Sequence, residues 1–258
     1  MRVSVCIPAF ESVPKVSRAI NSILQQKDVN YEIVVSDDSQ SSLVEDYIRG
    51  LGHDSIKYFK NREGQSSTSN WNNALSAAEG DILLLLHHDD YLLKDNALST
   101  ISEVILTNNL DLLWSSFENE VGFYRFFSRK FCYNLITRFP SSLFIVNYLS
   151  TPSCMAFKSS VVERYDESLK WYVDVEFYVR CIRRYKSSAF IQDTLIGIGR
   201  DGKRISDTIE NEEKLDEIKL MSIPIRLILS NRLLLNIIKC GLISLQLFCY
   251  YLKKWREL

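Results

Sequence analysis

Apolar and polar residues fall into alternating blocks along the first 115 residues, and each block has the period of a strand or of a helix. Short apolar runs predict strands at Val3–Ile7 (ended by Pro8, which lacks a backbone N–H), Ile33–Val35, Ile56–Phe59, Ile82–Leu86 and Leu110–Trp114. Apolar residues at helical spacing predict helices that start at Ser12 and Pro14, that end at Gly52, that span Ser66–Glu79 and that surround Leu98–Ile105. Parallel strands need crossover connections, so this alternation favours a mainly parallel sheet covered by helices.

The predicted strand Ile82–Leu86 is apolar throughout, which is typical of a central strand buried on both faces. It runs directly into His87, His88, Asp89 and Asp90. Adjacent carboxylates at the end of a buried strand repel one another unless a cation lies near them, and a divalent metal carrying a phosphate suits such oxygens. Alternatively, the two acids begin a loop and cap a helix that starts near Lys94.

A second acidic pair, Asp37–Asp38, follows the predicted strand Ile33–Val35. Ligands of parallel sheets bind outside the carboxyl ends of the strands, and both acidic pairs lie at such ends. The sequence contains no G-x-G-x-x-G fingerprint and no G-x-x-x-x-G-K loop, so neither of these phosphate-binding motifs is available. The acidic pairs are therefore the first candidates for a ligand site.

Composition excludes some classes of partner. The 31 Lys and Arg residues balance 32 Asp and Glu residues, which argues against a general nucleic-acid binder. The six cysteines form no C-x-x-C pair, which favours a reducing cytoplasm over a disulfide scaffold or a zinc site. The apolar run at the N-terminus is too short for a signal peptide, so we expect a cytoplasmic protein.

Taken in order, several segments resemble glycosyltransferase family 2, whose members have the GT-A nucleotide-sugar fold. These segments are Val3–Phe10, Glu32–Ser39, Asn70–Leu75 followed by Gly80–Asp81, and the D-x-D-like His88–Asp90. The resemblance extends over roughly residues 1–206 and implies an α/β, Rossmann-like fold with a mostly parallel central sheet. It also implies nucleotide contacts from Pro8, Phe10, Glu11, Asp38, Asn72, Asp89 and Arg200, and Asp89 and Asp90 as ligands of Mn²⁺ or Mg²⁺.

The chain departs from the family pattern around the expected metal. Many members have a further acid where this chain has His87 or His88. A neutral imidazole can bind Mn²⁺ but suits Mg²⁺ poorly; alternatively, one histidine packs against the sheet while the other bonds a phosphate or a nearby carbonyl. Further on, Gly202 replaces the histidine of the family's R-x-H segment. The basic residues Arg200, Lys203 and Arg204 either neutralise the leaving diphosphate or form a solvated loop.

Asp174 is the candidate catalytic base. It matches the aspartate of the family's E-D-x-[ED] helix start, although Val173 replaces the preceding glutamate. Inverting transfer needs one carboxylate that takes the proton of the acceptor hydroxyl, and the resemblance gives Asp174 this role. The alternative is a first-turn acid favoured by the helix dipole. Thr151–Ser153 resembles a segment that lines the acceptor side.

Two regions suggest a membrane. Residues 121–149 mix aromatic with basic residues, which is typical of a membrane interface but also fits a lid or an acceptor-domain core. From Ile223 to Trp255 the chain is mostly leucine and isoleucine, with polar residues at approximate helical spacing. Such interruptions favour an amphipathic helix over a spanning one, and its apolar face lies either in the cytoplasmic leaflet or on the catalytic domain.

These features combine into one functional hypothesis. Residues 1–115 form the nucleotide-sugar-binding half, 116–206 the acceptor-binding half, and 207–258 a C-terminal helical, membrane-associating extension. We expect a metal-dependent inverting glycosyltransferase, with a UDP-sugar favoured as donor and a lipid-linked saccharide as acceptor, at the inner face of the cytoplasmic membrane. Bacterial O-antigen or capsule synthesis is the expected pathway. The alternatives are a polyprenyl-phosphate sugar transferase and a non-catalytic nucleotide-sugar-binding scaffold.

Overall fold

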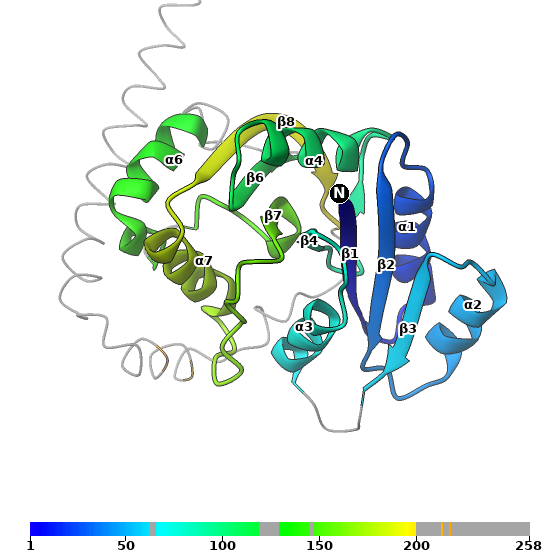
Figure 1. Ribbon diagram of the computed structural model, residues 1–258. Coiled ribbons are helices and arrows are strands. Elements are labelled where there is room, and N and C mark those ends of the chain that lie inside the picture. Colours follow the sequence, from blue (N-terminus) through cyan, green and yellow to red (C-terminus); the bar gives the residue numbers. More distant parts are fainter. Residues whose placement is uncertain (62–65, 119–128, 145–146, 200–212, 214–216, 218–258) are drawn as a thin grey trace, which may run out of the picture. The chain divides into compact units, whose positions relative to one another are not determined.

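The computed structural model describes residues 1–61, 66–118, 129–144, 147–199, 213 and 217. Nearly all of these belong to the compact unit Met1–Asp207, whose first part is an alternating series of strands and helices (Figure 1). In order, these are β1 (Arg2–Ala9), α1 (Val13–Leu24), β2 (Asn30–Asp37), α2 (Leu43–Leu51), β3 (Ile56–Lys60), α3 (Ser67–Ser76) and β4 (Ile82–Leu85). They are followed by β5 (Tyr91–Leu92), α4 (Ala97–Thr107), β6 (Leu112–Phe117), α6 (Arg129–Arg138), the 3₁₀ turns η1 (Pro140–Phe144) and η2 (Pro152–Cys154), β7 (Met155–Lys158), α7 (Val173–Arg184) and β8 (Ser188–Gly197).

The described strands form a single mixed sheet in the order β3-β2-β1-β4-β7-β6-β8-β5. The first four strands of this order are parallel neighbours. Strand β7 is antiparallel to both β4 and β6, while β6 and β8 are parallel and β5 is antiparallel to β8. Six of the eight described strands therefore run in one direction, which confirms the predicted mostly parallel sheet. The carboxyl ends of β1, β2 and β4 meet at the same edge.

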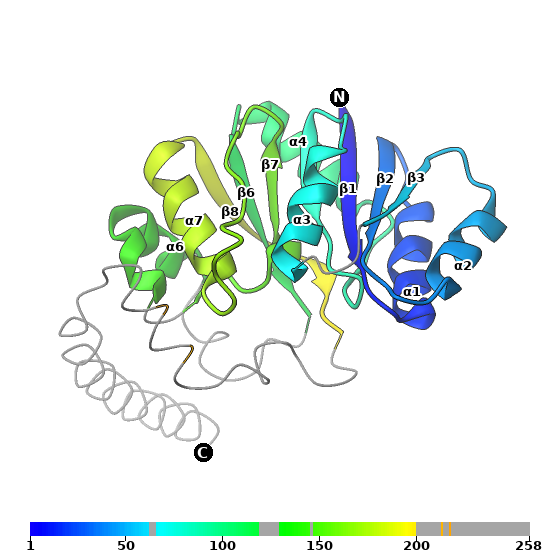
Figure 2. The same cartoon turned by 90° about the horizontal axis from the view of Figure 1, so that it is seen from below.

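Helices cover both faces of the sheet because successive strand residues point to opposite sides. One core combines α1, α2 and α4 with alternate strand residues such as Val5, Ile33 and Leu84. On the other face α3 packs against β1 and β2, and α7 places Phe177 and Tyr178 against aromatic residues of β7 and β6. Figure 2 shows α1 and α2 at the β3 end of the sheet and α6 and α7 at the β8 end.

Several predicted boundaries are wrong by a few residues. Strand β1 does not end before Pro8 but continues to Ala9. The backbone of Pro8 faces β4, which has already ended at Leu85, so the missing N–H of Pro8 breaks no hydrogen bond between strands. Helix α3 ends at Ser76 and not at Glu79, α4 starts at Ala97 and not near Lys94, and β6 is shifted to Leu112–Phe117. The short strand β5, the long strand β8 and the helix α6 were not predicted.

The features that suggested a membrane lie mostly outside the described residues. This holds for the whole of 223–255 and for part of 121–149, so both interpretations stay predictions, as does the division into the three segments 1–115, 116–206 and 207–258. Within the part of the chain that the structure describes, no helix combines the length and the apolar character that crossing a bilayer requires.

Candidate active site at the carboxyl edge of the sheet

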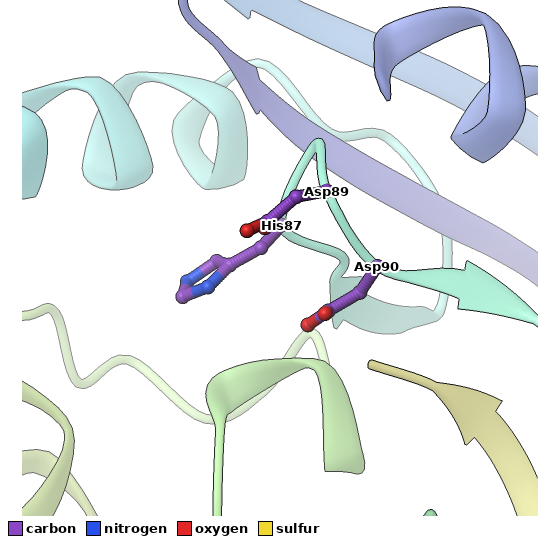
Figure 3. Close-up of side chains that lie close together, drawn as sticks. All are labelled: His87, Asp89 and Asp90. Atoms are coloured by element: carbon purple, nitrogen blue, oxygen red, sulfur yellow. The ribbon is translucent and has the colours of Figure 1, made fainter. Parts of the chain in front are cut away.

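The loop after β4 brings three potential metal ligands together. Leu86 continues the strand by donating its N–H to the Cys6 carbonyl, and the chain then turns, with the Asp90 N–H bonded to the His87 carbonyl at 2.9 Å. One ligand atom from each of His87, Asp89 and Asp90 lies within 4.8 Å of the others. Figure 3 shows the three side chains extending to one side of this loop. Two carboxylates and an imidazole are a donor set that suits a divalent cation such as Mn²⁺.

Asp90 is the buried member of this cluster. Its Oδ2 accepts a hydrogen bond from Ser153 Oγ at 2.6 Å and a longer one from Thr151, and its Oδ1 accepts from the Gly199 N–H at 3.1 Å. Burial is the main cause that raises the pKa of Asp90 to about 7, and the neighbouring Asp89 charge adds to it. A bound cation would offset both effects, so the electrostatics of the site fit a metal.

The two histidines have different environments. His88 donates from Nδ1 to the Pro8 carbonyl at 3.1 Å, which is the nearby-carbonyl contact expected for one of them. His87 packs its ring against Trp71, with the ring centroids 4.7 Å apart, and its Nε2 has no hydrogen-bond partner among the described residues. Burial lowers the pKa of His87, so the imidazole is neutral at pH 7 and can bind a metal.

Predicted nucleotide contacts surround the ends of β1 and β2. Phe10 is 52% exposed, and Glu11, which has a left-handed backbone (φ 52°), ties the loop after β2 by accepting hydrogen bonds from Gln40 and Ser41. Asp37 is fully buried and accepts hydrogen bonds from Ser39 and Tyr58. Asp38 is half-buried and its carboxylate has no hydrogen bond within the described ranges, so of this pair it is the acid available to a ligand.

Two further residues were predicted to contact the nucleotide, Asn72 and Arg200. The Asn72 amide is buried between α3 and the segment after β7, where it donates to the Tyr165 carbonyl and to Glu167 and accepts from the Tyr165 N–H. These hydrogen bonds join α3 to the segment after β7, and the nucleotide contact of Asn72 stays a prediction. Arg200 lies outside the described residues, but the residue before it, Gly199, already bonds Asp90.

Asp174 lies in the first turn of α7 and is held at both carboxylate oxygens. Oδ1 accepts from the Val175 N–H at 2.8 Å, and Oδ2 accepts from the Asn147 amide at 2.8 Å. Burial raises the pKa of Asp174 to about 6, and these hydrogen bonds oppose the rise. A carboxylate with this pKa is ionised at pH 7 yet basic enough to accept a proton.

Asn147, Thr151 and Ser153 belong to one short segment that contacts both acids. Asn147 bonds Asp174, whereas Thr151 and Ser153 bond Asp90. The sequence indicated an acceptor-side role for 151–153 but gave no signal for Asn147, because a single asparagine in an irregular segment has no informative spacing. The structure thus links the two predicted halves of the site through a segment of which only one end was predicted.

The sequence pattern described as Glycosyl transferase family 2 matches residues 4–166, which is more than half of the chain. The chain belongs to this family. It is 37% identical over 105 residues to the GalNAc(5)-diNAcBac-PP-undecaprenol beta-1,3-glucosyltransferase of Campylobacter jejuni, and 27% identical over 116 residues to the Escherichia coli UDP-Glc:alpha-D-GlcNAc-diphosphoundecaprenol beta-1,3-glucosyltransferase WfgD. These matches cover 40% and 45% of this chain but only 34% and 46% of the two relatives, so the chain matches less than half of each.

A solved structure supports the fold independently. The chain superimposes on S. aureus TarS 1–349 in complex with UDP-GlcNAc with a TM-score of 0.67, at 20% sequence identity, over 84% of this chain and 64% of that one. At this identity the likeness shows the fold alone. Together with the family match it confirms the predicted GT-A fold for the described part of this family 2 chain.

Proposed function

We propose that this family 2 chain is a metal-dependent, inverting glycosyltransferase that transfers a sugar from a nucleotide diphosphate sugar to a lipid-linked saccharide. A UDP-sugar is the favoured donor. Two curated relatives are named as glucosyltransferases of undecaprenol-diphosphate-linked acceptors, and one of these names specifies UDP-Glc. The proposal extends to bacterial surface polysaccharide synthesis at the inner face of the cytoplasmic membrane.

One observation carries the proposal. A carboxylate–imidazole cluster of His87, Asp89 and Asp90 lies where parallel strands of the sheet end, and a segment that bonds Asp90 also bonds the carboxylate of Asp174. A cation site and a base connected in this way are the two parts that inverting transfer requires. A scaffold that only binds nucleotide sugars has no need for the second part.

The cation and the donor have identifiable places. Asp89, Asp90 and His87 would hold Mn²⁺ or Mg²⁺, which when bound offsets the negative charge that grows on the leaving nucleoside diphosphate. The exposed ring of Phe10 and the carboxylate of Asp38, which has no hydrogen bond among the described residues, are groups at the β1 and β2 ends that are available to a nucleoside. Donor binding is thus assigned to the ends of β1, β2 and β4.

In the proposed reaction, the Asp174 carboxylate takes the proton of the acceptor hydroxyl as that oxygen attacks the anomeric carbon. A C–O bond forms to the acceptor while the bond from the anomeric carbon to the diphosphate oxygen breaks, and the nucleoside diphosphate leaves with the bonding electron pair. Attack from the face opposite the leaving group inverts the anomeric centre. An α-linked donor therefore gives a β-linked product, in agreement with the word "beta" in both relatives' names.

The Asp174→Asn variant tests this mechanism. We expect transfer from UDP-glucose to a GlcNAc-diphosphate lipid to fall by about 100-fold or more, because a positioned general base contributes roughly that much. Donor-dependent thermal stabilisation should persist, because the amide keeps the size of the side chain. The exposed Asp193→Asn on β8 is the matched control and should leave both quantities unchanged. Unchanged turnover of Asp174→Asn would remove Asp174 from the role of base.

A further inference from the structure

The segment Asn147–Ser153 is held at its first residue by a dense set of hydrogen bonds. The Asn147 amide nitrogen donates to Asp174 Oδ2 at 2.8 Å and to the Ser150 carbonyl at 3.0 Å. Its amide oxygen accepts from the backbone N–H groups of Leu149 and Ser150, at 3.1 and 3.0 Å. The amide therefore uses both of its N–H groups and both lone pairs of its oxygen, and its orientation is fixed.

The turn that follows Asn147 is strained and braced. Ser150 has a φ of 70°, a left-handed conformation that side chains other than glycine rarely adopt. Its carbonyl accepts from Tyr178 Oη of α7 at 3.2 Å as well as from Asn147. Backbone strain of this kind persists only where surrounding contacts over-determine it, and here one of those contacts comes from Tyr178 on the same helix that carries Asp174.

The other end of the segment is fixed on the metal-site acid. Ser153 Oγ donates to Asp90 Oδ2 at 2.6 Å and accepts from the His87 N–H at 3.0 Å. Asp174 and Asp90 come from different elements, α7 and the loop after β4. The segment therefore provides a short hydrogen-bonded connection from one acid to the other.

We propose that Asn147 is a positioning residue for the base Asp174, and that the segment Asn147–Ser153 keeps this base in register with the metal-binding loop. This inference rests on the proposed function, because it takes Asp174 as the base. The amide N–H orients one carboxylate oxygen and stabilises its charge. The remaining lone pairs of Asp174 stay available to the acceptor hydroxyl.

The surroundings of Asp174 favour a simple interpretation of its titration. Among the described residues, the titratable side chains Tyr165 and Tyr178 have pKa values that the Asp174 charge raises further. Burial keeps the pKa of both phenols far above the usual range, so both are neutral throughout the working range of pH. Removing the Asn147 donor by substitution with alanine therefore changes the hydrogen bonding of Asp174 without a second group titrating beside it, whereas Asn147→Asp adds a carboxyl group that titrates together with Asp174.

Two substitutions at one position separate orientation from turn structure. Asn147→Asp keeps an oxygen that can accept from the Leu149 and Ser150 N–H groups, so it preserves these two bonds of the turn, but it replaces the N–H donor by an oxygen that repels both Asp174 and the Ser150 carbonyl. Asn147→Ala removes both functions. Asn108→Ala is the matched control, because it removes an exposed hydrogen bond from the Asn108 amide to the Val104 carbonyl at the end of α4.

We expect both Asn147 variants to lower kcat by about 10- to 100-fold, because small displacements of catalytic groups cost that much. The acidic limb of the pH–rate profile should move to higher pH by roughly one unit, because the carboxylate loses a charge-assisted hydrogen bond. Thermal stabilisation by UDP-glucose with Mn²⁺ should persist in both variants. A purely structural role would change stability without moving the limb of the folded Asn147→Ala protein.

The outcomes separate this inference from the proposed function. Wild-type kcat and an unmoved limb in Asn147→Asp, together with an inactive Asp174→Asn, would overturn the positioning role and leave the base intact. An active Asp174→Asn would overturn both. Loss of donor stabilisation in Asn147→Asp would show that the residue supports the donor site and would also contradict the proposal.

Discussion

At the scale of single residues, Asp174 shows how opposed effects set a useful pKa. Burial disfavours the ionised carboxylate, whereas hydrogen bonds from the Val175 N–H and the Asn147 amide favour it. The balance raises the pKa of Asp174 to about 6, above the usual range of an aspartate but below physiological pH. The carboxylate is thus ionised and only moderately weaker than an optimal base at pH 7.

This balance predicts the pH dependence of the reaction. Below pH 6 the side chain is protonated and cannot accept the acceptor proton, so kcat/KM should rise with pH through about 6 and then level off. The measurement is the initial rate of transfer from UDP-glucose at saturating Mn²⁺. The same limb in the residual activity of Asp174→Asn would show that another group titrates, and would contradict the assignment.

Many members of the family are expected to have an acid where this chain has His87 or His88, and of these two His87 lies in the cluster with Asp89 and Asp90. This position of His87 predicts the metal preference. An imidazole binds Mn²⁺ well but suits Mg²⁺ poorly, because Mg²⁺ prefers oxygen ligands. We expect His87→Ala to weaken Mn²⁺ binding by about 10-fold or more while changing Mg²⁺ binding little. Electron paramagnetic resonance of free Mn²⁺, with Mg²⁺ as competitor, measures both affinities without an activity assay.

The chain contains its own control for this experiment. His53 is exposed on the loop before β3, so His53→Ala removes an imidazole without touching the cluster. Equal Mn²⁺ affinity in the wild type and in His87→Ala would show that His87 is not a ligand. In that case its ring would act only through its packing on Trp71.

At the scale of elements, the end of β8 closes against the loop after β4. Gly199, two residues beyond the strand, donates its N–H to Asp90. A Cβ added at Gly199 would lie well inside the van der Waals contact distance to the Asp89 carbonyl oxygen and 2.9 Å from the carbonyl carbon. Arg18 of α1 also holds that carbonyl, at 2.7 Å. The loop that carries Asp89 is therefore fixed by two elements distant in sequence.

This close approach predicts that Gly199→Ala disrupts the site more than the fold. The added methyl group must displace the backbone of the loop that carries Asp89, so metal-dependent stabilisation by UDP-glucose should be strongly reduced. The unfolding transition of the metal-free protein should remain cooperative. Differential scanning calorimetry with and without Mn²⁺ measures both quantities.

Gly50 in α2 provides the matched control. A Cβ at this exposed helical position meets nothing within 4 Å, so Gly50→Ala should stabilise the protein by about 0.5–1 kcal/mol through the helix propensity of alanine. Wild-type metal response in Gly199→Ala would contradict the proposed contact between the two loops.

At the scale of the whole molecule, local patterns predicted the N-terminal half well. There parallel strands alternate with helices along the chain, so the apolar residues of each element follow the spacing of a strand or of a helix. Ser12 and Pro14 mark the start of α1, and Gly52 marks the end of α2. Both acidic pairs lie at carboxyl ends as expected, because parallel strands place them on one edge.

The second half was harder because its pairing is not local. Strand β7 inserts antiparallel between β4 and β6, and β8 pairs with both β6 and the two-residue strand β5. Neither arrangement leaves a periodic signal in the sequence. The hydrogen bond from Asn147 to Asp174 depends on one amide in an irregular turn. On α3, Asn72 is hydrogen-bonded within the fold. Neither side-chain contact could be predicted from the spacing of residues in the sequence.

The measurement that tests the central claim most directly is thermal stabilisation of the purified chain by UDP-, GDP-, dTDP- and CMP-linked sugars, with and without Mn²⁺. Ligands that bind the native state raise its stability in proportion to ln(1 + [L]/Kd). We predict stabilisation by UDP-sugars that requires Mn²⁺ and is lost in Asp89→Asn. No stabilisation of the folded protein by any nucleotide sugar would contradict the account, and so would a response that Asp89→Asn and chelation leave unchanged.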